Sequence, residues 1–142
     1  MKVQAYLFFD GRCEEAIGFY KRALGADVQM LMRYKDSPEP AQPGMVPPGS
    51  ENKIMHASLR IGDEVVMMSD GHCKGTPRFE GFGLSITAAT ERDADRIFGA
   101  LSDGGNVQMP LTKTFFSPRF GMVHDRFGVL WMVIVEHEGA HA

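Results

Sequence analysis

Alternation of apolar and polar side chains marks the beginning of the chain as a β-strand. Between Val3 and Phe9, one set of alternate positions is wholly apolar, and the other set mixes polar with aromatic residues. A period of two with one apolar face is typical of a strand that covers a core. Asp10 and Gly11 then break the pattern. We therefore predict a strand over Val3–Phe9, with its more varied face directed away from the core.

A helical period replaces the alternation from Cys13 to Leu24. The apolar residues of this segment fall on one broad stripe, as on a helix that packs one face against a core. Acidic residues lie near its start and basic residues near its end, which complements the helix dipole. Gly25 is a natural C-terminal stop. The pattern predicts a helix over Cys13–Leu24.

Three further strands complete the first half of the chain. We predict them at Asp27–Tyr34, Lys53–Ile61 and Glu64–Ser69, the last two joined by a tight turn at Gly62 and Asp63. Proline and glycine crowd the segment Lys35–Asn52, which indicates a long loop. Such a loop either covers a functional site or is a mobile excursion, and the sequence leaves both readings open.

The order of strand, helix and three strands then occurs a second time. The predicted elements are a strand over Phe82–Thr87, a helix over Glu91–Leu101 capped by Thr90, and strands over Asn106–Lys113, Phe120–His124 and Val129–Glu136. We interpret the chain as a single domain, 1–142, made of two modules, 1–70 and 82–136. Two repeated units of this kind usually enclose one cavity.

Composition and charge exclude several classes of function. The chain has 142 residues, 44% of them hydrophobic, and a net charge of -3 without a basic stripe. Nucleic acid is therefore not an expected partner. No apolar run approaches the roughly 20 residues that span a bilayer, and no signal-peptide core precedes Asp10. We expect a cytoplasmic protein that does not bind a membrane.

The two cysteines are too far apart in sequence for a common metal motif. Cys13 and Cys73 form no pattern of a disulfide framework, so both are expected to be reduced. Cys13 lies in the first turn of the predicted helix, where the dipole lowers a thiol pKa. A reactive thiolate and a buried small apolar side chain are the two readings, and the second is favoured.

Three segments resemble a known family. They are LFFDGRCEEAIGFYKRALGA, IMHASLRIGDEVVMMSDG and FGMVHDRFGVLWMVIV, and together they are similar to PhnB-like proteins of the vicinal oxygen chelate superfamily. This superfamily includes glyoxalase I, bleomycin-resistance proteins and extradiol dioxygenases. The resemblance implies an α+β fold of two βαβββ modules whose mixed sheets form a cup, with the helices outside, and usually a homodimer.

The resemblance also indicates where a metal would bind. Enzymes of the superfamily hold a divalent cation through His, Glu or Gln on the first and fourth strands of each module. Those positions carry over to Gln4 or Ala5, Met67 or Met68, Phe82 or Gly83, and Met132. Only Gln4 could coordinate, so we predict no metal of the usual kind and no cofactor. A divalent metal remains possible through an unorthodox set of Gln4, His56 and His124.

The strand predicted over Lys53–Ile61 carries the candidate chemistry. Its alternation should pack Met55, Ala57, Leu59 and Ile61 under the helix and turn Ile54, His56, Ser58 and Arg60 to the concave face. Arg60 could bind a carboxylate or phosphate, and His56 could exchange a proton near neutral pH. These two are the candidate catalytic residues. The alternative is structural, with Arg60 in a salt bridge to a neighbouring carboxylate such as Asp70 or Glu64, and with His56 bonded to a backbone carbonyl.

Residues on other strands would complete a ligand cavity. We predict ligand contacts at Tyr6, Phe8, Ser58, Met67, Ser85, Thr87, Phe115 and Met132, although aromatic and methionine residues at such places are often ordinary core. Phe115 belongs to a short loop, Lys113–Phe116, that would form either a lid or a dimer contact. Trp131 should point away from the cavity because it alternates with Met132.

These observations support a protein that handles a small molecule without a catalytic metal. Two alternatives stay open: a metal-dependent lyase, isomerase or dioxygenase with replacement ligands, and a protein that sequesters a drug or metabolite. Methyl transfer with a nucleotide-like cofactor is not expected, because no glycine-rich loop connects a strand to a helix. The substrate, and whether one chain or two build the cavity, are not predicted.

Overall fold

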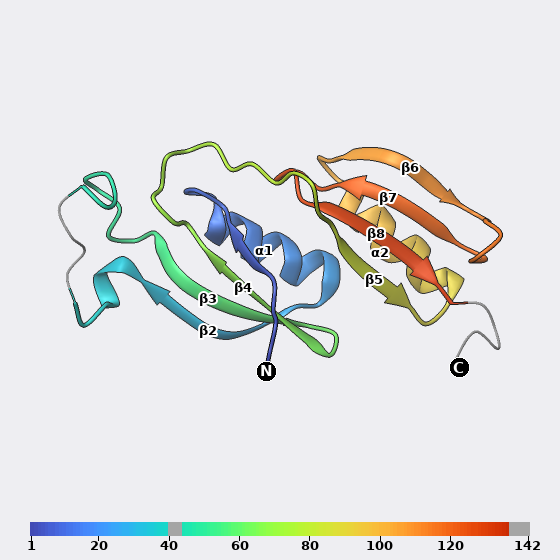
Figure 1. Ribbon diagram of the computed structural model, residues 1–142, viewed down its shortest axis with the longest axis horizontal. Helices are drawn as coiled ribbons and strands as arrows, with labels where there is room; N and C mark the ends of the chain where they lie inside the picture. Colours follow the sequence, from blue (N-terminus) through green and yellow to red (C-terminus); the bar gives the residue numbers. More distant parts are fainter. Residues whose placement is uncertain (40–43, 137–142) are drawn as a thin grey trace. The chain divides into compact units, whose positions relative to one another are not determined.

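The computed structural model describes residues 1–39 and 44–136, which form two compact units. The first unit extends from Met1 to Arg78, and the second begins at Phe79. Each unit contains one four-stranded mixed sheet and one α-helix (Figure 1). The predicted α+β fold and the repeated order of strand, helix and three strands are confirmed. The union of the two modules in a single domain stays a prediction.

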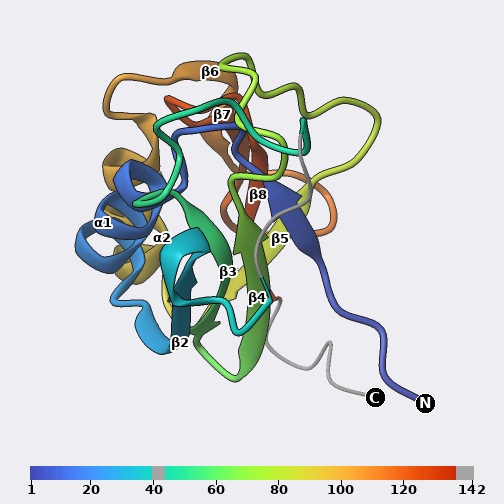
Figure 2. The same cartoon turned by 90° about the vertical axis from the view of Figure 1, so that its left-hand side faces the viewer.

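The first unit follows the predicted order. Its elements are β1 (Tyr6–Phe8), α1 (Cys13–Leu24), β2 (Asp27–Arg33), a 3-10 turn (Tyr34–Asp36), β3 (Ile54–Ile61) and β4 (Glu64–Ser69). The strands are arranged β1-β4-β3-β2, with β1 parallel to β4 and the other pairs antiparallel. Figure 2 shows α1 on one side of this sheet, so the other side of the sheet is left open within the unit.

The core of the first unit lies between α1 and the sheet. The strands contribute Leu7, Ala57, Leu59 and Met68, Phe9 adds a ring directly after β1, and α1 contributes Ala16, Ile17, Phe19, Tyr20 and Ala23. These strand positions alternate with the residues of the open face, as the pleat requires. Gly25 ends α1 with a φ of 64°, a left-handed conformation that glycine adopts without strain.

A buried carboxylate joins three segments of this unit. Asp70 follows β4, and its Oδ1 accepts hydrogen bonds from the backbone N–H groups of Gly11 at 2.9 Å and Cys13 at 2.8 Å. Its Oδ2 accepts a hydrogen bond of 2.7 Å from the N–H of Ile54. The Arg12 side chain does not cap α1, so Asp70 supplies the missing acceptor at the helix N-terminus.

The second unit repeats the topology. Its elements are β5 (Leu84–Ala88), α2 (Glu91–Ser102), β6 (Asn106–Thr112), β7 (Phe120–His124) and β8 (Leu130–Val135), and the sheet order is β5-β8-β7-β6. Thr90 caps α2 as predicted, because its Oγ1 accepts a hydrogen bond from the N–H of Asp93 at 3.0 Å. Trp131 is buried and donates from Nε1 to Asp125 at 2.9 Å. Trp131 was expected to point away from the cavity, into the core or against a partner subunit, and the structure has it in the core.

Three local predictions differ from the structure by more than one residue or in the face assigned. The strand expected over Phe82–Thr87 is β5 over Leu84–Ala88, because its pairing with β8 begins only at Leu84. The first strand begins at Tyr6 rather than Val3, because β1 has one neighbour and pairs with β4 at only three positions. Ile54, expected beside His56 on the open face, is fully buried. The pairing of Met32 with His56 and of Arg33 with Ile54 leaves Met55 as an extra residue. This bulge shifts the alternation at the start of β3.

No helix of the described residues is long and apolar enough to cross a bilayer.

Candidate functional sites

The open face of the first sheet brings most of the predicted ligand contacts together. Strand register places Tyr6 opposite Met67, and Met67 opposite Ser58, so these three side chains form one row across β1, β4 and β3. Phe8 is two residues beyond Tyr6, on the same face. Met67 contributes a thioether to this row, and Tyr6 and Ser58 contribute hydroxyl groups. The face therefore combines apolar surface with a few polar groups.

Tyr6 and His56 form a hydrogen-bonded pair on this face. The Tyr6 hydroxyl lies 2.8 Å from Nδ1 of His56, and the two rings are 5.5 Å apart. Burial raises the pKa of the Tyr6 phenol, so the hydroxyl keeps its proton at neutral pH. Phe8 stacks on Tyr6 with the ring centres 4.9 Å apart. The partner of His56 is therefore a phenol and not the backbone carbonyl of the structural alternative.

Arg60 lies at the far end of β3 and is paired. Its guanidinium is 3.2 Å from a carboxylate oxygen of Asp27 on β2, and both side chains are more than half exposed. The structural alternative for Arg60, a salt bridge to a neighbouring carboxylate, is confirmed, although the partner is Asp27 and neither of the examples, Asp70 and Glu64. Asp70 is instead buried in its backbone network. A ligand that bound Arg60 would have to compete with Asp27, so a catalytic role for Arg60 stays a prediction.

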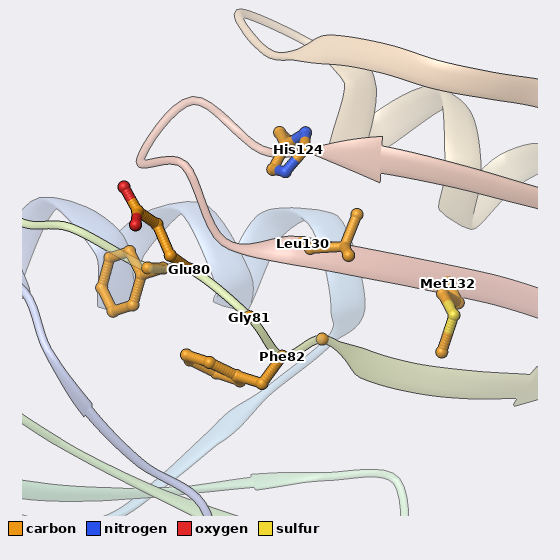
Figure 3. A pocket seen from close by; sticks show the side chains of 8 residues that line it. Glu80, Gly81, Phe82, His124, Leu130 and Met132 are labelled. Atoms are coloured by element: carbon orange, nitrogen blue, oxygen red, sulfur yellow. The ribbon is translucent and has the colours of Figure 1, made fainter.

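The second unit contains a pocket of about 460 Å³ (Figure 3). Eight residues line it: Phe79, Glu80, Gly81, Phe82, Gly83, His124, Leu130 and Met132. The segment before β5 forms one side, and the adjacent ends of β7 and β8 form the other. A Cβ on Gly83 would stand 3.1 Å from Cδ2 of Leu130, so glycine allows the segment to lie close to β8.

The chemistry of this pocket is apolar with two ionisable groups. Phe79 and Phe82 meet edge to face at 6.5 Å, and Leu130 and Met132 add aliphatic and thioether surface. His124 and Glu80 are the ionisable residues of the lining. Such a lining suits a small molecule that is mainly apolar and carries one or two polar groups.

Three other predicted contact residues belong to the second unit. Ser85 is paired with Met132, and Thr87 with Ile134, so both hydroxyl residues follow the pocket along β5, where they are exposed. Phe115 is 95% exposed and packs edge to face on Phe116. Its role as a lid or as a dimer contact stays a prediction.

The cysteines are free. Cys13 is fully buried, and burial together with the Asp70 carboxylate raises its pKa. The reading of Cys13 as a reactive thiolate is wrong, because burial outweighs the helix dipole. Cys73 is half-buried, and burial raises its pKa as well.

The superfamily's metal positions do not fit a divalent cation in this chain. Met67 is half-buried on the open face and Met68 lies in the core, and neither thioether suits a hard cation. In the second unit, Phe82, Gly83 and Met132 border the pocket and offer no carboxylate or imidazole. Over residues 1–39 and 44–136, no three His, Cys, Asp or Glu side chains gather as a metal ligand set.

Sequence reasoning missed part of the pocket. Phe79, Glu80 and Gly81 lie between the predicted modules 1–70 and 82–136, where no site was expected, and Leu130 was expected only as a strand residue. An aromatic pair spaced three apart around a glycine, just before a strand, was the available signal. The sequence did single out His124 and Met132, and the pocket brings these two together.

Fold and sites together define a small α+β protein of paired βαβββ modules. The family model described as 3-demethylubiquinone-9 3-methyltransferase matches residues 1–134. The chain belongs to this family, a PhnB-like group of the vicinal oxygen chelate superfamily, as its sequence predicted.

Relatives agree with this assignment. Protein YjdN of Escherichia coli K12 is 34% identical over 95% of both chains. The crystal structure of PA1353 from Pseudomonas aeruginosa is 40% identical, with a TM-score of 0.83 over 97% of this chain and 99% of that one. A Bacillus cereus structure described as a putative 3-demethylubiquinone-9 3-methyltransferase, PhnB protein, is 27% identical, with a TM-score of 0.78 over 95% and 99% of the two chains.

More distant proteins share the fold alone. The fosfomycin resistance protein FosX from Listeria monocytogenes is 7% identical, with a TM-score of 0.67 over 100% of this chain and 98% of that one. This likeness supports the fold class and carries no conclusion about the ligand.

Proposed function

We propose that the protein is a cytoplasmic homodimer that binds a small, mainly apolar molecule in the pocket of the second unit. The observation that carries the proposal is the pocket itself, a concavity of about 460 Å³ with aromatic, aliphatic and thioether walls. Sites for small ligands commonly have volumes of roughly 300–1,000 Å³ and a few polar groups in an apolar lining. His124 and Glu80 would orient the polar end of the ligand.

Dye binding tests this proposal. We expect an anilinonaphthalene sulfonate dye to bind the native protein with increased fluorescence, and Met132→Gln to weaken binding about tenfold by placing an amide in the apolar wall. Met45→Gln is the matched control, because Met45 is an exposed methionine of the first unit. Equal binding by both variants, or no binding to the native protein, would contradict the proposal.

A sequestering protein and an enzyme differ in whether the bound compound is chemically changed. Binding of a metabolite without chemical change favours a sequestering protein, the reading that the apolar lining supports. Chemical change of a bound compound would favour an enzyme. The candidate catalytic residues His56 and Arg60 lie in the first unit and not in this pocket, so substitution of either would show whether the change takes place on the first unit. Product analysis after prolonged incubation with the bound compound separates the two.

Metal-dependent chemistry with replacement ligands is the alternative from the superfamily. The sequence suggested Gln4 and His56 of the first unit and His124 of the second as its donors, and no observation on the described residues favours this set. Elemental analysis of the freshly purified protein tests it. A stoichiometric divalent metal that is lost in His56→Ala would support this alternative over binding without a metal.

The description of the family names methyl transfer, which we do not expect because no glycine-rich loop connects a strand to a helix. The first turn of α1 donates to Asp70, and that of α2 donates to Thr90. In each helix, one N–H group of the first turn thus already has a side-chain acceptor. Calorimetric titration with S-adenosylmethionine checks this expectation, and saturable binding would overturn it.

A further inference from the structure

The hydrogen bond between Tyr6 and His56 in the first unit indicates which nitrogen of His56 carries the proton. This inference does not depend on the ligand pocket of the second unit. The hydroxyl of Tyr6 and Nδ1 of His56 are 2.8 Å apart, so one of the two atoms carries the shared proton. A phenol that keeps its proton can donate to Nδ1, and a neutral imidazole that accepts there has its own proton on Nε2. Tyr6 would thereby select one of two otherwise similar tautomers.

The surroundings of the pair favour a ligand on the same face. His56 is half-buried on the open side of the sheet, and among the described residues its hydrogen-bond partner is Tyr6. Phe8 is 57% exposed and stacks on Tyr6 at an angle of 27° between the rings, which makes a nearly flat aromatic surface beside the imidazole. Arg60 is held by Asp27, so His56 and Ser58 are the polar groups of β3 on this face that can donate to a ligand, and His56 is the one beside the aromatic surface.

We propose that Tyr6 holds His56 in the tautomer protonated on Nε2, and that this N–H donates to an acceptor oxygen of a flat, otherwise apolar ligand lying against Phe8. Tyr6 is a positioning residue in this arrangement, and His56 contacts the ligand. The ligand class is an aromatic or conjugated molecule with a carbonyl or carboxylate oxygen. A flat ring can stack on the aromatic surface of Phe8, and the oxygen can accept the hydrogen bond from Nε2 of His56.

Nitrogen NMR of the protein with isotope-labelled histidine tests the tautomer. We expect the native protein at neutral pH to show His56 protonated on Nε2, and Tyr6→Phe to produce a mixture of tautomers. Tyr34→Phe is the matched control, because the Tyr34 hydroxyl is also half-buried but donates to the carbonyl of Gly71. Protonation of Nδ1 in the native protein, or an unchanged spectrum in Tyr6→Phe, would overturn the proposal.

Two probes with the same rings test the ligand. Naphthoate has acceptor oxygens, whereas naphthylmethylammonium has none, so only naphthoate should shift the Nε2 signal of His56. We expect its affinity to fall about tenfold in His56→Leu, the loss of one charge-assisted hydrogen bond. Met132→Gln should leave the His56 shift unchanged, which separates this site from the pocket of the second unit. Absence of a naphthoate-dependent shift, or equal shifts with both probes, would contradict the inference.

Discussion

Asp70 shows at the scale of one residue how a buried charge organises its surroundings. Three backbone N–H groups from separate segments converge on its carboxylate, at 2.7 to 2.9 Å. A carboxylate is acceptor-only, so it satisfies all three donors, whereas an amide presents an NH₂ group to at least one of them. The residue fixes the start of α1 relative to β3, the strand that carries His56.

Replacement of this carboxylate is the first prediction. We expect Asp70→Asn to lower the free energy of unfolding by about 2 to 3 kcal/mol, since a buried donor loses its acceptor. Urea unfolding measures the change. Asp63→Asn, at an exposed position in the β3–β4 turn, is the control and should cost little. A cost as small as that of the control would show that water replaces the network.

The two thiols provide the second prediction. Cys13 is fully buried and Cys73 half-buried, and burial raises the pKa of both. An aromatic disulfide reagent should therefore modify Cys73 slowly in the native protein and Cys13 only after unfolding. Absorbance of the released thiolate follows the reaction, and Cys73→Ser should abolish the native phase. A fast native reaction in Cys73→Ser would contradict the burial of Cys13.

At the scale of secondary-structure elements, α1 and β2 are tied by an ion pair on the surface. Arg33 makes two contacts with Glu14, at 2.6 and 3.1 Å, and also donates to the carbonyl of Asn52. The hydrogen bonds from Arg33 hold the pKa of Glu14 below its ordinary value. Arg33 therefore connects the helix with the end of β2 and with Asn52, two residues before β3.

The third prediction follows from the sign of this pKa shift. A carboxyl whose pKa is lower in the folded state stabilises the fold above its unfolded pKa, near 4.3. The contribution is lost as the pH falls through the folded value. The difference in unfolding free energy between the native protein and Glu14→Gln should thus be small, present at pH 7, and gone in strong acid.

Chemical unfolding at several pH values measures that difference. Glu51→Gln is the control, because Glu51 has an exposed carboxylate and no ion pair in residues 1–39 and 44–136. A difference that grew toward acid would contradict the assigned direction.

Element positions could be predicted from the sequence because they depend on local chemistry. The period of the apolar residues, the cap at Thr90 and the stop at Gly25 each act within a few residues, and the structure has α1 and β4 at the predicted bounds. Ile54 could not be predicted, since its burial depends on a bulge in the pairing with β2. The Tyr6–His56 pair joins residues 50 positions apart, so only the sheet register reveals it.

At the scale of the whole molecule, the edge strands of the two sheets bear on whether the chain forms a homodimer. β2 and β6 are edge strands, and both expose apolar side chains. Val28, Met30 and Leu31 on β2, and Val107 and Met109 on β6, are between 37% and 44% exposed. Soluble proteins usually protect such edges with charge or with a partner. Exposed apolar edges are therefore consistent with the expected homodimer.

The last prediction concerns which edge strand, β2 or β6, forms the dimer interface. β2 has three exposed apolar residues and β6 has two, so a partner on β2 would remove more apolar surface from water. We expect the native protein to sediment as a dimer at micromolar concentration, and Met30→Lys to weaken the dimer about tenfold or more by burying a charge. Met109→Lys makes the same change on the other edge and should leave the dimer intact. A native monomer would refute the dimer, and dissociation by Met109→Lys alone would move the interface to β6.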